Sequence, residues 1–247
     1  MFDAAALRAR LESVRDRIAR AAGRARRDPA SIQLLAVSKT FKADWVRAAA
    51  DAGQIDFAEN KVQEASEKMR EVSSLPLRWH LIGHLQSNKA RRAAALFNMI
   101  HSVDSAALLA KLDHAATEEG RTVDVLVQVD LAGEATQHGV PPDKVFEILE
   151  AARDYQAALV RGLMTIPPAV AAPEAARPYF ASLRTLQDAL RTRGVNPLML
   201  QELSMGMSFD FDVAIEEGST LVRVGSAIFG ERGHVSPGPV GSPEFIR

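Results

Sequence analysis

Short apolar runs alternate with amphipathic, helix-like segments along most of the chain. The runs follow one another after Pro29, and most are apolar on both faces, which is typical of buried parallel strands. We predict strands at 32–39, 56–60, 78–83, 99–104, 123–130, 160–165, 198–206 and 220–229. Helical segments lie between them, at 43–52, 61–72, 105–119, 143–155, 174–193 and 210–217.

Eight strands alternating with helices predict an α/β fold, a single (β/α)8 barrel of the TIM type. A doubly wound parallel sheet is the main alternative, because the pattern does not show whether the sheet closes. The count of eight favours closure. Leu7, Leu11 and Val14 recur at helical spacing, which predicts an extra helix before the barrel.

Arginines are concentrated on the other side of that first helix. They are Arg8, Arg10, Arg15, Arg17 and Arg20. Acidic residues such as Glu12 and Asp16 interrupt them, so we interpret this side as a solvated face rather than a nucleic-acid patch.

Composition narrows the class of protein. The chain has 247 residues, 47% hydrophobic and 25% charged, which fits one large globular domain. Thirty Lys and Arg against 31 Asp and Glu give a net charge of −1, which argues against binding to nucleic acid or anionic membranes. With no cysteine, the sequence excludes disulfides, thiolate catalysis and Cys-based metal sites.

The two ends of the chain give further expectations. The amino-terminal segment has no apolar stretch typical of a secretion signal, and no run is long enough to span a bilayer, so we expect a cytoplasmic protein. Residues 1–233 are predicted to form the barrel. Residues 234–247 are rich in Pro and Gly and are predicted to be a disordered tail, and the GSPEF in that tail resembles a cloning scar.

Lys39 is the first candidate for chemistry. Function in such a barrel lies at the carboxyl ends of the strands, and Lys39 ends the first predicted strand. Alternation places Leu35, Val37 and Lys39 on one face. If that face is the barrel interior, desolvation favours the neutral amine, a nucleophile able to form a Schiff base. The alternative is a lysine that extends its ammonium group into water.

The last predicted strand carries a second candidate. Alternation places Leu221, Arg223 and Gly225 together, and a guanidinium inside a strand needs an acceptor or a ligand. Gly225 and Ser226 then combine close backbone approach with a hydroxyl at the end of the eighth strand. That is the usual phosphate site of these barrels.

The seventh predicted strand can contribute to the same phosphate site. Ser204 and Gly206 lie near its end, and the seventh and eighth strands are neighbours in a closed barrel. A plain turn of glycine and serine is the alternative when these residues are taken alone. Beside Gly225 and Ser226, the phosphate interpretation is favoured.

Histidines give no prediction of a metal site. His80 and His84 have a spacing that suggests a shared ion, but on one strand they would lie roughly 13 Å apart. The remaining histidines form no cluster in the sequence, so we expect no metal. They are His101, His114, His138 and His234.

An amine nucleophile, an arginine and a phosphate cradle therefore converge on one barrel mouth. Pyridoxal 5′-phosphate (PLP) needs such a set: a lysine for the Schiff base, a site for the phosphate and a group facing the pyridine nitrogen. Long motifs carry a resemblance as well: LLAVSKT at 34–40, FAEN at 57–60, WHLIG at 79–83, LQSNK at 85–89, RGLMT at 161–165, LSMGMS at 203–208 and GSTLVRVGSAIFG at 218–230. With them, the chain closely resembles the pyridoxal phosphate homeostasis protein family from about residue 5 to residue 233.

The resemblance implies a fold-type III barrel, similar to the amino-terminal domain of bacterial alanine racemase. It implies that Lys39 holds PLP as a Schiff base and that Arg223 faces the pyridine nitrogen. It assigns the phosphate to Ser204, Gly225 and Ser226. It also implies that Asn60 and Met205 line the pocket.

Some positions depart from the family pattern. Ala58 stands where Gly is usual, Lys61 where Tyr is usual and His84 where Pro is common. Ser226 replaces a usual Thr and keeps the hydroxyl. The loop at 130–139 lacks the Asn and Lys often found there.

The resemblance implies a PLP carrier that serves vitamin B6 and amino-acid homeostasis without established catalysis. PLP-dependent apoenzymes are the expected recipients, and a monomer is expected. A small fold-type III enzyme with weak amino-acid racemase activity is the alternative, and a PLP-independent Schiff-base aldolase is a third. Racemisation needs two opposed bases, and neither Tyr155 nor Tyr179 is a convincing second base.

Overall fold

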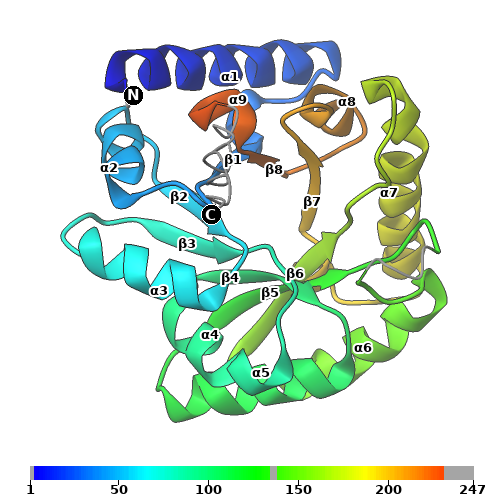
Figure 1. Ribbon diagram of the computed structural model, residues 1–247. Helices are drawn as coiled ribbons and strands as arrows, with labels where there is room; N and C mark the ends of the chain where they lie inside the picture. The colour runs from blue at the N-terminus through cyan, green and yellow to red at the C-terminus, as the bar shows by residue number, and fades with distance from the viewer. Residues whose placement is uncertain (1–2, 134–137, 231–247) are drawn as a thin grey trace, which may run out of the picture.

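A closed barrel of parallel strands forms the centre of the molecule (Figure 1). The computed structural model describes residues 3–133 and 138–230. The strands pair in chain order, and pairing of the first with the last, Leu34 with Val222, closes the sheet and excludes the doubly wound alternative. They are β1 (Gln33–Val37), β2 (Asp56–Glu59), β3 (Arg78–Leu81), β4 (Met99–Val103), β5 (Val123–Gln128), β6 (Ala158–Met164), β7 (Glu202–Met207) and β8 (Leu221–Val224).

Helices surround the barrel and bury one apolar stripe each against it. They are α1 (Ala4–Arg24), α2 (Ala43–Asp51), α3 (Val62–Glu71), α4 (Ala90–Leu96), α5 (Ala106–Glu118), α6 (Val145–Ala151), α7 (Arg177–Thr192), α8 (Phe211–Glu216) and α9 (Ser226–Phe229). Single turns of 3-10 helix lie at Pro29–Ser31, Ser87–Lys89, Pro142–Lys144, Ala152–Asp154, Pro173–Ala176 and Pro197–Met199. The predicted tail at 234–247 lies outside the described residues.

Several predicted strands were too long, most of all the seventh and the eighth, and two helices, α4 and α9, were not predicted. The eighth strand ends at Val224, and the predicted remainder up to residue 229 turns at Gly225 into helix α9. The seventh strand begins at Glu202 instead of residue 198, since Pro197–Met199 form a 3-10 turn. Helix α4 is short and rich in alanine. An apolar run of a few residues fits a strand or a buried helical turn equally well, so periodicity could not separate them.

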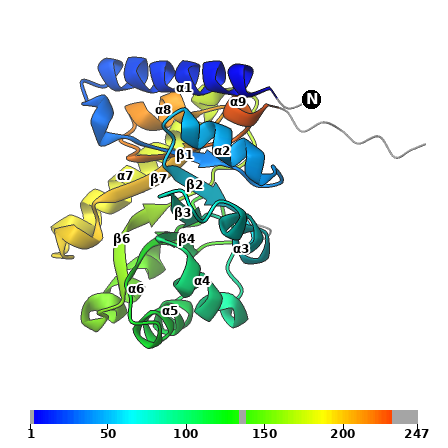
Figure 2. The same cartoon turned by 90° about the vertical axis from the view of Figure 1, so that its left-hand side faces the viewer.

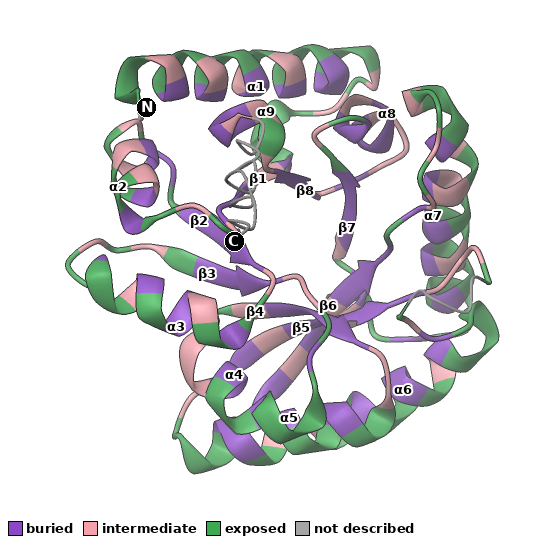
Figure 3. Cartoon of the chain, viewed as in Figure 1, coloured by how far each residue is buried: buried purple, intermediate pink, exposed green. Residues whose placement is uncertain are grey.

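Apolar side chains form two layers, one inside the barrel and one between barrel and helices. Figure 3 shows the buried residues along the strands and on one side of each helix. The inner layer is small and consists of Leu35, Val37, Ala58, Leu126, Met164 and Leu221. This confirms that the face of β1 carrying Leu35 and Val37 points inward. The outer layer is much larger and contains the buried faces of the helices.

Helix α1 lies across one side of the barrel, against α2, α8 and α9 (Figure 2). Its arginines are not all solvated, which corrects the interpretation from sequence. Arg10 Nε donates to Ile228 O over 2.7 Å, and Arg15 donates to Ala52 O over 2.9 Å. Arg17 pairs with Asp212 and covers the ring of Phe211, whereas Arg8 and Arg20 are exposed as predicted. Exposed carbonyls at the ends of short helices supply acceptors that the sequence pattern does not show.

Among the described helices, none combines the length and the apolar character that crossing a bilayer requires.

Candidate functional site

Lys39 lies in the tight connection between β1 and α2, at the carboxyl end of the barrel. Its side chain is half-buried. Ser38, the residue before Lys39, is held by helix α3, because Lys68 of that helix donates to Ser38 O over 2.7 Å. The hydroxyl of Ser38 donates over 2.6 Å to Glu59, and the same carboxylate pairs with Lys68 at 2.5 Å. A buried ion pair thus anchors the connection that presents Lys39.

The same helix also supports a strained residue next to Lys39. Thr40 has a φ of +71°, in the left-handed region that non-glycine residues rarely adopt. Its N–H donates over 2.5 Å to Glu64, which lies 3.3 Å from Lys68.

The buried ion pair also affects the ionisation of Glu59. Burial raises the pKa of the Glu59 carboxyl, against the opposing effect of Lys68. Its second oxygen, Oε2, is buried and has no hydrogen-bond partner among the described residues.

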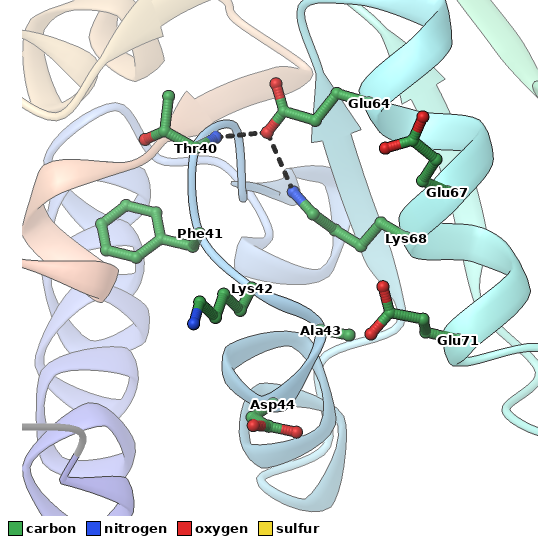
Figure 4. Close-up of a pocket in the computed structure, with 9 residues that line it drawn as sticks. All are labelled: Thr40, Phe41, Lys42, Ala43, Asp44, Glu64, Glu67, Lys68 and Glu71. Carbon is green, nitrogen blue, oxygen red and sulfur yellow. Dashed lines mark hydrogen bonds and ion pairs between the residues drawn. The ribbon is translucent and has the colours of Figure 1, made fainter.

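A pocket of about 340 Å³ opens on the outer side of this connection (Figure 4). It lies between the start of α2 and the exposed side of α3, and its charged lining is Lys42, Asp44, Glu64, Glu67, Lys68 and Glu71. Four carboxylates against two ammonium groups do not suit a phosphate. We therefore do not interpret this pocket as an anion site; its lining residues Glu64 and Lys68 help to hold the β1–α2 connection.

Arg223 is the buried cation of the barrel interior, only 3% exposed. It donates over 2.7 Å to Ser204 Oγ and over 2.9 Å to Thr165 O. Burial lowers the pKa of Arg223 to about 10, and Asp210 opposes that shift. The guanidinium is therefore still protonated at neutral pH, fixed from two neighbouring strand ends.

A chain of buried hydrogen bonds leads away from Arg223 across the interior. Ser204 Oγ lies 2.8 Å from His101 Nδ1, and His101 Nε2 lies 3.0 Å from His80 Nδ1. His80 Nε2 reaches Asp56 Oδ1 at 3.4 Å. Burial lowers the pKa of His101 far below its ordinary value, and both His80 and Arg223 add to the shift. The pKa of Asp56 is lowered as well: burial raises it, but hydrogen bonds from His80 and Arg78 outweigh burial.

Glycine and serine backbone forms a cradle at the ends of β7 and β8. Ser208 Oγ accepts from Gly225 N over 3.0 Å and from Ala227 N over 3.4 Å. Gly206 has a φ of +89°, and a methyl group there would lie 2.5 Å from Ala214 Cβ. The cradle thus needs glycine at 206 for both backbone shape and space.

The other candidate residues from the sequence differ in how deeply they are buried. Asn60 follows β2, half-buried, and its carbonyl lies 2.1 Å from where a methyl group on Gly83 would be. Ser226 is exposed at the start of α9. Met205 is fully buried in the outer apolar layer, on the opposite face from Ser204. A contribution of Met205 to the mouth of the barrel would have to come from its main chain.

Comparison with known proteins agrees with this geometry. Residues 6–233 match the family described as alanine racemase, N-terminal domain. A pyridoxal phosphate homeostasis protein of Aquifex aeolicus is 42% identical over 223 residues, which cover 90% of this chain and 97% of that protein. The chain belongs to the pyridoxal phosphate homeostasis protein family.

Two solved structures place this family member among known folds. PipY of Synechococcus elongatus, solved with PLP bound, is 42% identical and superposes with a TM-score of 0.81, covering 91% of this chain and 100% of that one. An alanine racemase of Clostridium difficile has a TM-score of 0.67 at 17% identity and covers 92% of this chain and 57% of that one. The second likeness shows the fold alone.

Sequence reasoning missed several polar residues of this homeostasis-family barrel. His80 and His101 face inward on the adjacent strands β3 and β4, and Thr165 and Ser208 follow β6 and β7. Alternation along β3 and β4 was the signal that could have found the histidine pair, since both occupy inward positions of neighbouring strands.

Two of the remaining histidines, His101 and His138, each contact one of the pair His80 and His84, which the sequence did not predict. His80 contacts His101 inside the barrel, and the rings of His84 and His138 stack with their centroids 3.7 Å apart. These contacts join different strands and loops, and spacing along the chain does not report them.

Proposed function

We propose that this protein binds PLP through Lys39 and holds it for delivery, so that it serves vitamin B6 and amino-acid homeostasis without turning over a substrate there. Membership of the homeostasis family and the PLP held by PipY support the proposal. The observation that carries it is Arg223, a protonated guanidinium buried at the strand ends beside a glycine–serine cradle.

The residues present fit this cofactor. A methyl group at Gly225 would lie 3.3 Å from Val37 O, so glycine keeps the ends of β8 and β1 close together. The N–H groups of Gly225 and Ala227 donate to Ser208 Oγ here, and a phosphate oxygen would take the place of that hydroxyl as their acceptor. Lys39 supplies a primary amine from the connection after β1, which neighbours β8 in the barrel.

Each residue has a distinct part in the proposal. Bound PLP supplies an aldehyde that condenses with an amine, a pyridine ring and a phosphate. Lys39 provides that amine, and Arg223 directs N–H groups at the pyridine nitrogen. Ser204, Gly206, Gly225 and Ser226 are proposed to hold the phosphate. Asn60, and Met205 through its main chain, are proposed to complete the pocket.

Arg223 also disfavours transamination-type chemistry, and it fits either holding of PLP or racemisation. An arginine donates hydrogen bonds to the pyridine nitrogen without giving up its proton at neutral pH. The ring then withdraws electrons weakly from any attached group. Tyr155, a tyrosine considered as a second base, lies just before β6, at the opposite end of the barrel from Lys39. Within this proposal the recipients are enzymes that need PLP, and the protein acts as a monomer.

The test is reduction of the PLP-loaded protein with borohydride, followed by peptide mass spectrometry. We expect a phosphopyridoxyl group on Lys39, and loss of the visible absorption band in Lys39→Ala. Lys42→Ala is the matched control, because Lys42 is exposed in the same connection. Label on another lysine, or a band that persists in Lys39→Ala, would refute the assignment. Racemisation of free amino acids that disappears in Lys39→Ala would favour the enzyme alternative.

A further inference from the structure

Three metal-ligating side chains meet at the carboxyl end of the barrel, away from the β7–β8 cradle. His84 follows β3, Asp104 follows β4 and His138 lies in the connection after β5. One ligand atom from each lies within 4.8 Å of the other two. Three successive strands thus deliver two imidazoles and one carboxylate to one point. From this geometry we propose that His84, Asp104 and His138 bind a divalent transition-metal ion of the zinc class.

The separations match the size of such a site. Zinc binds imidazole nitrogen and carboxylate oxygen at about 2.1 Å, so two ligands of a tetrahedral ion lie about 3.4 Å apart. His84 Nδ1 and Asp104 Oδ2 are 3.4 Å apart without any adjustment. The imidazoles stack with only 10° between their planes. Since a nitrogen lone pair lies in the plane of its ring, metal binding requires the rings to rotate out of the stack.

The main chain behind two of the ligands is anchored, which favours a defined site. Gln128 donates over 2.6 Å to His138 O, and Val140 N returns a bond to Gln128 O over 2.9 Å. On the other side, Ser102 Oγ donates over 2.7 Å to Gly83 O, directly before His84. The histidine side chains are exposed and Asp104 is half-buried, so rotation costs little packing.

The donor set indicates which ions would bind. Two imidazoles and one carboxylate suit zinc, nickel or copper, whereas magnesium and calcium prefer an all-oxygen shell. Three protein ligands leave one tetrahedral position open for water or a small anion. Gly83, the residue before His84, packs directly on the main chain of Asn60, so the proposed metal site lies next to a residue of the proposed PLP pocket.

The test is calorimetric titration of the PLP-loaded protein with ZnCl2 after removal of metals with a chelator. We expect one zinc ion per chain, and affinity at least tenfold weaker in His84→Ala, His138→Ala and Asp104→Asn. His114→Ala is the control, because His114 is an exposed histidine of α5 outside the cluster. Cobalt(II) serves as a second probe, and its visible absorption bands should strengthen in the wild type and not in His84→Ala.

The outcomes separate this site from the PLP site. The Lys39-dependent absorption band, recorded in the same samples, should be unchanged in His84→Ala, which also shows that the variant is folded. Absence of zinc binding, or zinc binding that is as strong in His84→Ala and His138→Ala as in the wild type, would overturn the metal site and leave PLP binding untouched. In the wild type, zinc binding without the Lys39-dependent absorption band would count against the PLP assignment alone.

Discussion

Donor and acceptor roles along the buried chain from Arg223 to Asp56 follow from the chemistry of its ends. Arg223 can only donate, so Ser204 Oγ accepts from it. Among the described residues, His101 Nδ1 is the acceptor in reach of the Ser204 hydroxyl, so His101 carries its proton on Nε2 and donates to His80. The ionised Asp56 accepts at the far end. This series of hydrogen bonds therefore presents the Ser204 oxygen as an acceptor to Arg223, whose charged form burial destabilises.

Ser204→Ala tests whether Ser204 positions Arg223 or serves the phosphate alone. Removal of the hydroxyl takes one buried hydrogen bond from Arg223 and one from His101, which keep Thr165 O and His80 as partners. An unsatisfied buried donor or acceptor costs about 1–3 kcal/mol. We expect the PLP-free variant to lose about 2 kcal/mol or more in free energy of unfolding, measured with urea. Ser226→Ala, at an exposed position, should change it by less than about 0.5 kcal/mol. An unchanged stability of Ser204→Ala, with weaker PLP binding, would instead favour a phosphate role.

The positions of Lys39 and Arg223 could be predicted at the residue scale, but most of the partners of Arg223 could not. Alternation and a strand-end position are local properties, so they pointed to both side chains. The bond from Ser204 to His101 joins residues 103 positions apart and depends on barrel register. Thr165 contributes a carbonyl, which has no signature in the sequence.

At the scale of elements, α3 and the β1–α2 connection form one unit. Lys68 and Glu59 are both almost fully buried, and together they hold the main chain of Ser38. The sequence predicted both elements to within about two residues, because their apolar periodicity is strong. It did not predict the ion pair, since a lysine within a polar helix usually faces water. Helix α9 was missed for the opposite reason, as its apolar residues continue the run of β8.

Lys68→Met is predicted to loosen the Lys39 connection. It leaves the Glu59 carboxyl buried without its cation, and breaking a buried pair in this way costs about 3 kcal/mol. We expect that loss in urea unfolding, together with a weaker PLP absorption band at equal PLP concentration. Glu67→Gln, an exposed change on the same helix, is the control. The double variant Glu59→Gln, Lys68→Met should recover part of the stability. If Lys68→Met alone kept full stability and full PLP binding, the anchoring role would be wrong.

For the molecule as a whole, closure of the barrel and the first helix act together. Helix α1 packs on α2, α8 and α9, so it bridges elements from both ends of the chain where β1 pairs with β8. Its arginines bind carbonyls of α9 and of the residue after α2. The count of eight strands predicted closure, and the apolar stripe of α1 predicted a packed helix. The position of α1 on the barrel follows from contacts far apart in sequence.

The pH dependence of the free energy of unfolding should show that His101 is neutral inside the barrel. His101 has a pKa well below its ordinary value of about 6.5, so in the folded protein it stays neutral where the unfolded chain takes up a proton. The unfolded state then binds more protons, and stability falls as pH decreases through that value. Between pH 7 and pH 5.5 the loss from this one group is about 1 kcal/mol.

His101→Asn removes this titration while keeping a polar side chain in the barrel. The free energy of unfolding, measured with urea at several pH values, should therefore fall less steeply in the variant over pH 7 to 5.5, whatever its stability at pH 7. Glu59 acts in the opposite sense, because its raised pKa favours proton uptake by the folded state. It is present in both proteins, so the comparison isolates His101. Equal slopes in the two proteins would mean that His101 is not held neutral by the fold.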